Sequence, residues 1–309
     1  MILFYSSLSI KKNDDTKFFK YVKRKDYNNT KFAIIRRSCN VCGLFSFYIV
    51  NLGFIHKYLL EGYVPIIDIK SYPNVFNGFN TSKNNYWETF FEQPFDYTLE
   101  EVLQNGKNIV NITFDDCQPR PDFLIFYNSP IRNFWYNFAN KYLRIKKELI
   151  DLSKKIEYKL FKNSKNILGV LTRGTDYLSL RPKGHPIPPN ISDLIKDVKE
   201  MDDKYKYDYI FFTTEDETFR DKFASSFSKK VKQLRPKKRI DYDYLKKDFI
   251  NKNINIQGSE EFNKIYLLNI IILSDCLDLI TARCSATTGL FVLTTGYRHI
   301  KIYELGEFE

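Results

Sequence analysis

Apolar and polar positions along the chain form blocks that predict strands and helices in alternation. Short apolar runs typical of buried strands lie at 31–36, 64–68, 166–171, 207–213, 277–282 and 299–303. Longer segments with helical periodicity lie at 44–60, 133–160, 191–201, 215–227, 259–275 and 287–294. Residues 70–130, which mix proline, asparagine and aromatic residues, give no clear assignment. The alternation of strand and helix predicts an α/β fold.

The length of the chain predicts two domains, because 309 residues are about twice the commonest domain size. We place the boundary near residue 160, which gives an N-terminal domain at 1–160 and a C-terminal domain at 161–309. Two doubly wound domains that face each other bind ligands in a cleft at the carboxyl ends of their strands. Candidate functional residues are therefore those that directly follow strands.

Composition excludes several other classes of protein. With 43% hydrophobic and 17% aromatic residues the chain is not disordered, and 12 glycines and 11 prolines exclude a collagen-like repeat. No run of 18 apolar residues predicts a membrane span, and the first residues are unlike a secretory signal. The five cysteines do not suggest a disulfide framework. We therefore expect a cytoplasmic protein.

The net charge of +11 is concentrated in one segment. Residues 228–252 hold ten lysines and arginines against three acids, a net charge of +7. Such a run is usually a solvated surface, and the alternative is a contact with polyanionic glycan or an anionic membrane, which would make the protein membrane-associated. Nucleic acid is not expected as a partner, because no RNA-recognition, homeodomain or zinc-finger signature is present.

Polar residues that suit phosphate follow the strand at 166–171. Arg173 offers a planar fork of donors to two phosphate oxygens, and Gly174 lets the backbone approach a ligand closely. The structural alternative is an internal ion pair between Arg173 and Asp176.

Two further strands of the same half end in candidate binding residues. Glu215 and Asp216 follow the strand at 207–213, where they either accept hydrogen bonds from a sugar or base or simply favour the helix dipole. Thr214 lies three residues before Glu217, the spacing of a capping box. The turn 285–289 opens a helix whose N–H groups either bind an anion or carry an ordinary Ser/Thr cap. Together, these three features predict a phosphate site.

A C-x-x-C motif, Cys39 to Cys42, lies between the first strand and its helix. A redox pair is one interpretation. The interpretation that we favour is that Gly43 is the functional feature, because it follows the motif and opens a helix that faces the cleft.

Several of these motifs resemble those of one enzyme family. The run Val170-Leu171-Thr172-Arg173-Gly174-Thr175-Asp176, followed by His185-Pro186-Ile187, resembles the donor-binding motif of the GT-B fucosyltransferases, with its H-x-R-R-x-D core. This superfamily contains the α1,6-fucosyltransferases and the nodulation-type and protein O-fucosyltransferases. Thr214-Glu215-Asp216 is similar to the family's Thr-Asp-Asp motif, and Leu273-Ser274 with Ser285 is similar to its third motif. Cys42-Gly43-Leu44-Phe45-Ser46 is similar to its N-terminal glycine-rich loop.

The resemblance implies two Rossmann-like domains that face each other across a cleft, the GT-B architecture. It implies an inverting, metal-independent transfer from a GDP-sugar, with no cofactor, in which Arg173 holds the β-phosphate of the departing GDP. The implied donor-binding residues are Gly43, Arg173, Gly174, Thr175, Arg181, His185, Glu215, Asp216, Ser285, Ala286 and Thr287. His185 has a structural alternative, since a histidine among prolines can order its loop by packing.

The chain departs from the family pattern at several positions. Leu171 replaces a histidine near the nucleotide, Gly174 replaces the second arginine, and Asn269 lies near an aspartate that reads guanine in the family. Arg181 replaces a candidate acidic base and is our candidate for the second positive charge.

An inverting transfer needs a base within reach of the acceptor hydroxyl. Asp176 is our catalytic candidate beside Arg173, and Glu88 or Glu92 of the N-terminal half are the alternatives. Asp115 and Asp116 lack the D-x-D spacing of metal-dependent transferases, so we expect no metal.

These observations predict a bacterial-type glycosyltransferase that moves fucose or a heptose-like sugar from a GDP-sugar to a surface or capsular glycan or lipopolysaccharide. The N-terminal domain would bind the acceptor and the C-terminal domain the donor. An alternative on the same fold is a transferase of a non-sugar group or an inactive nucleotide-sugar binder. A nucleic-acid-binding protein is the third hypothesis.

Overall fold

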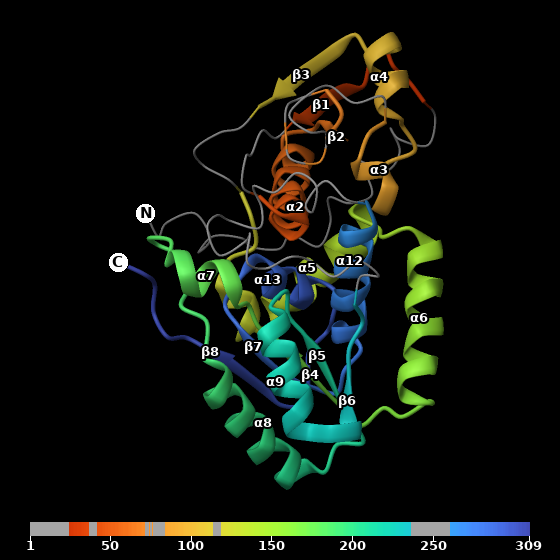
Figure 1. The fold of residues 1–309 in the computed structure, drawn as a ribbon. Helices are drawn as coiled ribbons and strands as arrows, with labels where there is room; N and C mark the ends of the chain where they lie inside the picture. Colours follow the sequence, from red (N-terminus) through yellow and green to blue (C-terminus); the bar gives the residue numbers. More distant parts are fainter. Residues whose placement is uncertain are drawn as a thin grey trace.

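The computed structural model describes residues 25–36, 42–71, 74, 76, 84–113, 119–235 and 260–309. Within these ranges the chain forms two parallel sheets, each in contact with helices (Figure 1). The predicted α/β fold is therefore confirmed.

The first sheet has the strand order β2-β1-β3 and belongs to the N-terminal half. Its strands are β1 (Lys31–Arg36), β2 (Val64–Asp68) and β3 (Asn108–Ile112), and both pairings are parallel. Helix α2 (Leu44–Leu60) connects β1 to β2 and is buried along most of its length. This apolar helix packs both on the first sheet and on helices that follow it in the chain.

The second sheet has the strand order β6-β5-β4-β7-β8, again with parallel pairing throughout. Its strands are β4 (Ile167–Leu171), β5 (Tyr209–Thr213), β6 (Val231–Lys232), β7 (Asp278–Ala282) and β8 (Ile300–Tyr303). The chain first moves outward from β4 to β6 and then returns to β7 on the other side of β4. The order therefore reverses between β4 and β7, which is the usual place of a ligand site in such sheets.

Helices connect these strands and cover both faces of the second sheet. They are α8 (Ile191–Tyr205), α9 (Glu217–Phe227), α12 (Glu260–Ser274) and α13 (Ser285–Val292). Apolar residues of α8 and α9, such as Leu194 and Phe223, pack in one core cluster with Val170 and Phe212 of the sheet. The opposite face packs in a second cluster with α12 and α13.

The two halves share this second core cluster, because α2 packs directly on the C-terminal half. The Phe45 ring of α2 meets the Tyr266 ring of α12 edge-on, with 5.1 Å between centroids. Gly289 of α13 makes the approach possible, since a Cβ atom there would overlap the Phe45 ring. The carboxyl edge of the second sheet consequently lies next to the N-terminal half (Figure 1).

The segment between the sheets contains further helices, of which the first three lie in the unassigned region 70–130. They are α3 (Trp87–Phe90), α4 (Leu99–Asn105), the 3₁₀ helix η2 (Phe123–Phe126), α5 (Ser129–Tyr142) and α6 (Lys147–Phe161). The predicted single helix at 133–160 is wrong, because α5 and α6 are separate. The break is held by backbone bonds to the α3 region: Lys146 N–H donates to the Phe90 carbonyl and Glu92 N–H to that of Arg144.

Helices α5 and α6 pack on α13 and α12, so they contact elements that follow the proposed boundary at 160. The division into 1–160 and 161–309 stays a prediction. Within the described ranges no helix is both long and apolar enough to span a bilayer. The basic segment 228–252 is described only as far as 235, where Lys230 binds Asp202 at 2.8 Å and Arg235 lies 3.6 Å from Glu217.

Candidate functional site

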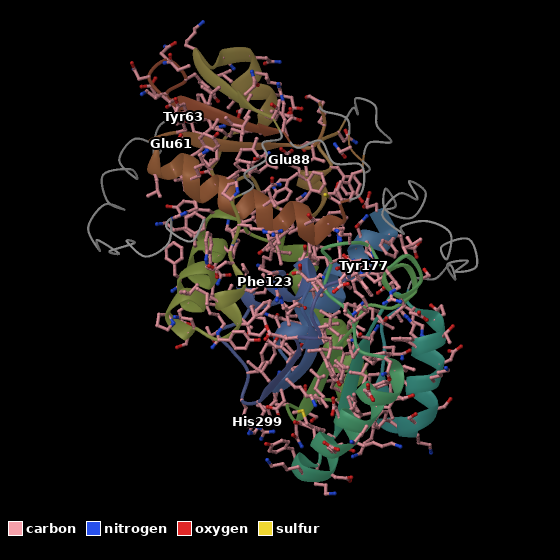
Figure 2. All side chains as sticks on the ribbon, turned by 90° about the vertical axis from the view of Figure 1, so that its left-hand side faces the viewer. Glu61, Tyr63, Glu88, Phe123, Tyr177 and His299 are labelled. Carbon is pink, nitrogen blue, oxygen red and sulfur yellow. The ribbon has the colours of Figure 1, made fainter. Side chains whose placement is uncertain are left out.

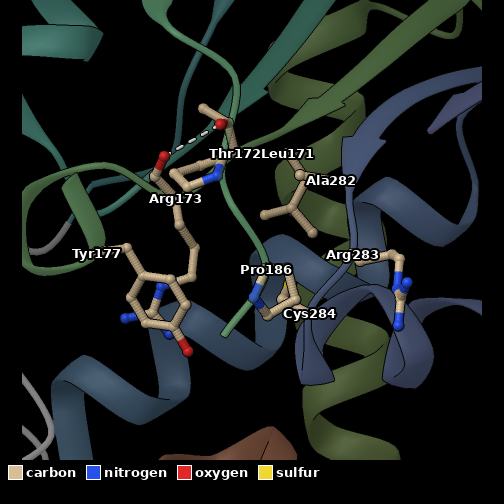
Figure 3. Close-up of a pocket in the computed structure, with 9 residues that line it drawn as sticks. Leu171, Thr172, Arg173, Tyr177, Pro186, Ala282, Arg283 and Cys284 are labelled. Carbon is tan, nitrogen blue, oxygen red and sulfur yellow. Dashed lines mark hydrogen bonds between the residues drawn. The ribbon is translucent and has the colours of Figure 1, made fainter. Parts of the chain in front are cut away.

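A narrow pocket opens where the strand order of the second sheet reverses. The residues that line it come from the end of β4, the end of β7, the short helix α7 (Thr175–Leu180) and the loop after that helix. They are Leu171, Thr172, Arg173, Tyr177, Pro186, Pro188, Ala282, Arg283 and Cys284 (Figure 3). The cavity measures about 10 Å³, roughly the space of one water molecule. In Figure 2 Phe123 and Tyr177 lie near the junction of the two halves, whereas His299 lies at the opposite end of the C-terminal half.

Arg173 lies at the mouth of this pocket, two residues after the last residue of β4. Its Cζ lies 4.0 Å from the centre of the Tyr177 ring, in a cation–π contact. Its Nε lies 3.7 Å from Oε1 of Glu215, and 23% of the side chain is exposed. The guanidinium is therefore held in place while part of it remains accessible to an anion.

The two carboxylates after β5 brace the loop that carries Arg173. Glu215 Oε1 accepts a hydrogen bond of 2.8 Å from the Gly174 N–H. Asp216 packs so closely that a Cβ atom on Gly174 would lie 2.6 Å from its Oδ2, which explains why a glycine is needed here. Both acids therefore hold the loop that carries Arg173 and Gly174.

Asp216, rather than Thr214, caps helix α9. Asp216 Oδ1 accepts from the Phe219 N–H at 3.0 Å, and the helix begins at Glu217. Thr214 instead accepts from the Asp216 N–H at 3.2 Å. The predicted Thr214–Glu217 capping box is therefore wrong, because the aspartate next to the helix takes the cap position.

The N-terminus of α13 lies at the β7 side of the pocket. Its N-cap residue is Cys284, and no side chain in the described ranges caps this helix. The N–H groups of Ser285, Ala286 and Thr287 lie in its first turn, where an anion is favoured. The Thr287 side chain is fully buried, and its hydroxyl donates to the Ala282 carbonyl at 2.6 Å. Thr287 can therefore serve a ligand through its backbone only.

Arg181 and His185 do not line the pocket. Arg181 ends α7 in a left-handed conformation (φ 45°), is exposed, and has its Cζ 5.5 Å from the Phe308 ring centre. His185 is exposed and meets the Tyr177 ring edge-on, with 5.4 Å between centroids. Backbone bonds join its loop to the C-terminal segment, with Phe308 N–H donating to the His185 carbonyl at 3.0 Å. This arrangement agrees with a packing role for His185, since His185 contacts the Tyr177 ring and that ring covers Arg173.

Two carboxylates proposed as alternative bases are engaged in the N-terminal half. Glu88 Oε1 accepts from Gln93 at 2.7 Å and from Asn85 at 3.1 Å, and both amides bind the backbone of Ile67 in β2. Glu92 forms a 2.6 Å ion pair with Arg144.

Other predicted residues are placed only in part or lie outside the described residues. Gly43 is the N-cap of α2, and its carbonyl accepts from the Ser46 N–H at 3.0 Å. The side chains of Thr175 and Asp176, and all of Cys39, Asp115 and Asp116, lie outside the described residues. The described ranges contain no group of three or more His, Cys, Asp or Glu residues that could hold a metal. The roles of Gly43, Thr175 and Asp176 stay predictions.

Sequence analysis missed several lining residues, among them Tyr177 and Arg283. Arg283 directly follows β7, so the rule that singled out Arg173 applies to it as well. Tyr177 has no such signal, because it belongs to a short helix inside a segment that reads as loop.

Comparison with known proteins links this fold to one group of structures. No family model matches the sequence, and no curated protein matches it. A mutant of Arabidopsis thaliana FUT1 in complex with GDP aligns at a TM-score of 0.50 and 10% identity, over 92% of this chain and 73% of that one. Fucosyltransferase NodZ from Bradyrhizobium aligns at a TM-score of 0.46 and 15% identity, over 85% of this chain and 92% of that one. POFUT1 in complex with GDP aligns at a TM-score of 0.49 and 9% identity, over 90% of this chain and 100% of that one. The motif-based expectation is confirmed at the level of fold by the first of these structures: the chain has the GT-B fold of Arabidopsis thaliana FUT1.

Proposed function

We propose that the protein is an inverting, metal-independent glycosyltransferase that moves a sugar from a GDP-sugar to a glycan acceptor. One observation carries the proposal: Arg173 and the uncapped N-terminus of α13 border the same pocket, at the point where the strand order reverses. Both features attract phosphate, and this place in a parallel sheet is where nucleotides are commonly bound.

The chemistry that these residues offer is stabilisation of a leaving diphosphate. Negative charge develops on the phosphate oxygens as the bond to the sugar breaks, and a fixed guanidinium is most effective at that moment. The first-turn N–H groups of α13 would add donors without any movement. Asp176 is the proposed base that takes the proton of the acceptor hydroxyl. Arabidopsis thaliana FUT1, which has the same fold, was solved with GDP, and this supports guanosine diphosphate as the leaving group.

The remaining parts of the proposal follow from the sequence. The donor sugar would be fucose or heptose-like, and the acceptor a surface or capsular glycan bound by the N-terminal half. The reaction would take place in the cytoplasm, with the basic segment 228–252 as a contact to anionic membrane.

The test is an Arg173→Ala variant assayed with a panel of GDP- and UDP-sugars and a glycan acceptor panel. We expect wild type to release GDP in an acceptor-dependent manner, and the variant to be slower by about 10²–10³-fold. Arg144→Ala is the control, because Arg144 is half-exposed and pairs with Glu92 away from the pocket. A folded Arg173→Ala protein with unchanged turnover would overturn the proposal. Binding of a nucleotide-sugar without any transfer would instead favour the inactive binder.

A further inference from the structure

A second arginine, Arg283, lies at the pocket on the side opposite Arg173. It directly follows Ala282, the last residue of β7, and β7 pairs with β4 so that Thr281 lies beside Leu171. The two arginines therefore emerge from neighbouring strands at the point where the strand order reverses. Both line the pocket, and Figure 3 shows their side chains on opposite sides of Pro186 and Cys284.

The environment of Arg283 leaves its donors underused. Its Cζ lies 4.1 Å from the centre of the Phe123 ring, and its Nη2 lies 3.8 Å from Glu307, a half-exposed residue. Its Nε is buried, and no residue in the described ranges accepts a hydrogen bond from it. A buried donor without an acceptor is unfavourable, so a turn of the side chain that brought this donor to a ligand oxygen would remove that cost.

Other arginines of the chain show what a satisfied guanidinium looks like here. Arg36 lies 2.7 Å from Asp68, and Arg298 lies 2.7 Å from Asp278, both with fully buried carboxylates as partners. Among the described residues, the one carboxylate near Arg283 is that of Glu307 on the C-terminal segment, at the longer distance of 3.8 Å. Arg283 is thus the more available cation, and it is available at the pocket.

We propose that Arg283 is the second cationic ligand of the donor's diphosphate, an inference that rests on the proposed function. Arg173 would bind one phosphate and Arg283 the other, after its side chain turns from Phe123 and Glu307 towards the pocket. Each phosphate of a sugar diphosphate carries a negative charge, and the guanidinium fork matches its oxygens. Two arginines then supply the two positive charges that a divalent cation supplies in metal-dependent sites.

Arg181, which the sequence suggested for this role, is placed less well. It ends α7, is exposed, and contacts Phe308 rather than the pocket. Arg283 needs only a side-chain rotation, because its backbone already lies between β7 and the N-terminus of α13.

The test compares GDP and GMP affinities by calorimetry in EDTA for the full chain and its variants. For Arg283→Ala and Arg283→Gln we expect GDP affinity to fall about 10–100-fold, as for loss of a charged hydrogen-bond donor. GMP affinity should change much less, because one phosphate can still bind Arg173. Arg283→Lys should recover part of the loss, since it keeps the charge without the fork, and Arg144→Ala should bind like wild type.

The possible failures are distinguishable. If wild type binds GDP and the folded Arg283 variants bind it equally well, this inference is overturned while the proposed function stands. The same holds if Arg181→Ala, and not Arg283→Ala, lowers the GDP affinity, or if GDP and GMP are affected alike. If wild type binds neither GDP nor any GDP-sugar, the proposed function fails, and this inference fails with it.

Discussion

A pair of neighbouring carboxyl groups predicts how stability depends on pH. Glu157 lies on α6, and Asp275 follows the last residue of α12, at the end of the sheet opposite the pocket. Burial, and then the neighbouring Asp275 carboxylate, raise the pKa of Glu157 to about 7, against the smaller opposing effects of Lys165 and Lys154. Burial also raises the pKa of Asp275. At neutral pH the folded protein therefore retains protons that the unfolded chain releases.

The sign and size of the effect follow from proton linkage. Between pH 4.5, the ordinary pKa of a glutamate, and about 7, the folded state binds more protons than the unfolded state, so the free energy of unfolding falls as pH rises. The full difference in the pKa of Glu157 corresponds to about 3 kcal/mol. Because the side chain is only partly buried, water screens the charge, and we expect a cost of about 1–2 kcal/mol above pH 7.

The perturbation is Glu157→Gln, which cannot ionise. We expect the variant to be more stable than wild type by about 1–2 kcal/mol at pH 8 and nearly equal to it at pH 4.5. Thermal unfolding at both pH values measures this, with a rise of about 2–3 °C in melting temperature at pH 8. Glu148→Gln, on the exposed face of the same helix, is the control and should show no such pH dependence. An equal effect of Glu157→Gln at both pH values, or a loss of stability at pH 8, would refute the reasoning.

Two glycines give predictions that separate stability from binding. Gly289→Ala places a Cβ against the Phe45 ring, so we expect denaturant unfolding to show a loss of about 1–3 kcal/mol; an unchanged midpoint would mean that α2 and α13 pack differently. Gly174→Ala drives a Cβ into Asp216 and displaces the loop of Arg173, so calorimetry should show GDP affinity reduced by about tenfold or more. Unchanged affinity in a folded Gly174→Ala protein would contradict the bracing role of Asp216.

The main strands were predictable because burial leaves a clear mark on them. All five residues of β4 and of β7 are buried, and both strands read as short apolar runs. Strand β6 has two residues and is defined by its pairing with β5, in which Val231 lies beside Ile210, so no local pattern could reveal it. The break between α5 and α6 was hidden for a related reason. It depends on backbone bonds to residues 90 and 92, which are distant in sequence.

The candidate site was predictable only as far as it depends on single strand ends. Arg173 and Glu215 were found because each follows an apolar run. The pattern of an apolar run does not indicate whether the carboxylate after it accepts a hydrogen bond from a ligand or from a distant backbone N–H. Glu215 does the latter, at Gly174. Arg283 satisfies the same rule as Arg173, but its importance depends on β7 lying next to β4, which is a property of the strand order. Residues that follow strands should therefore be weighed by their strand's distance from the reversal point, and by that measure Arg283 is equal to Arg173.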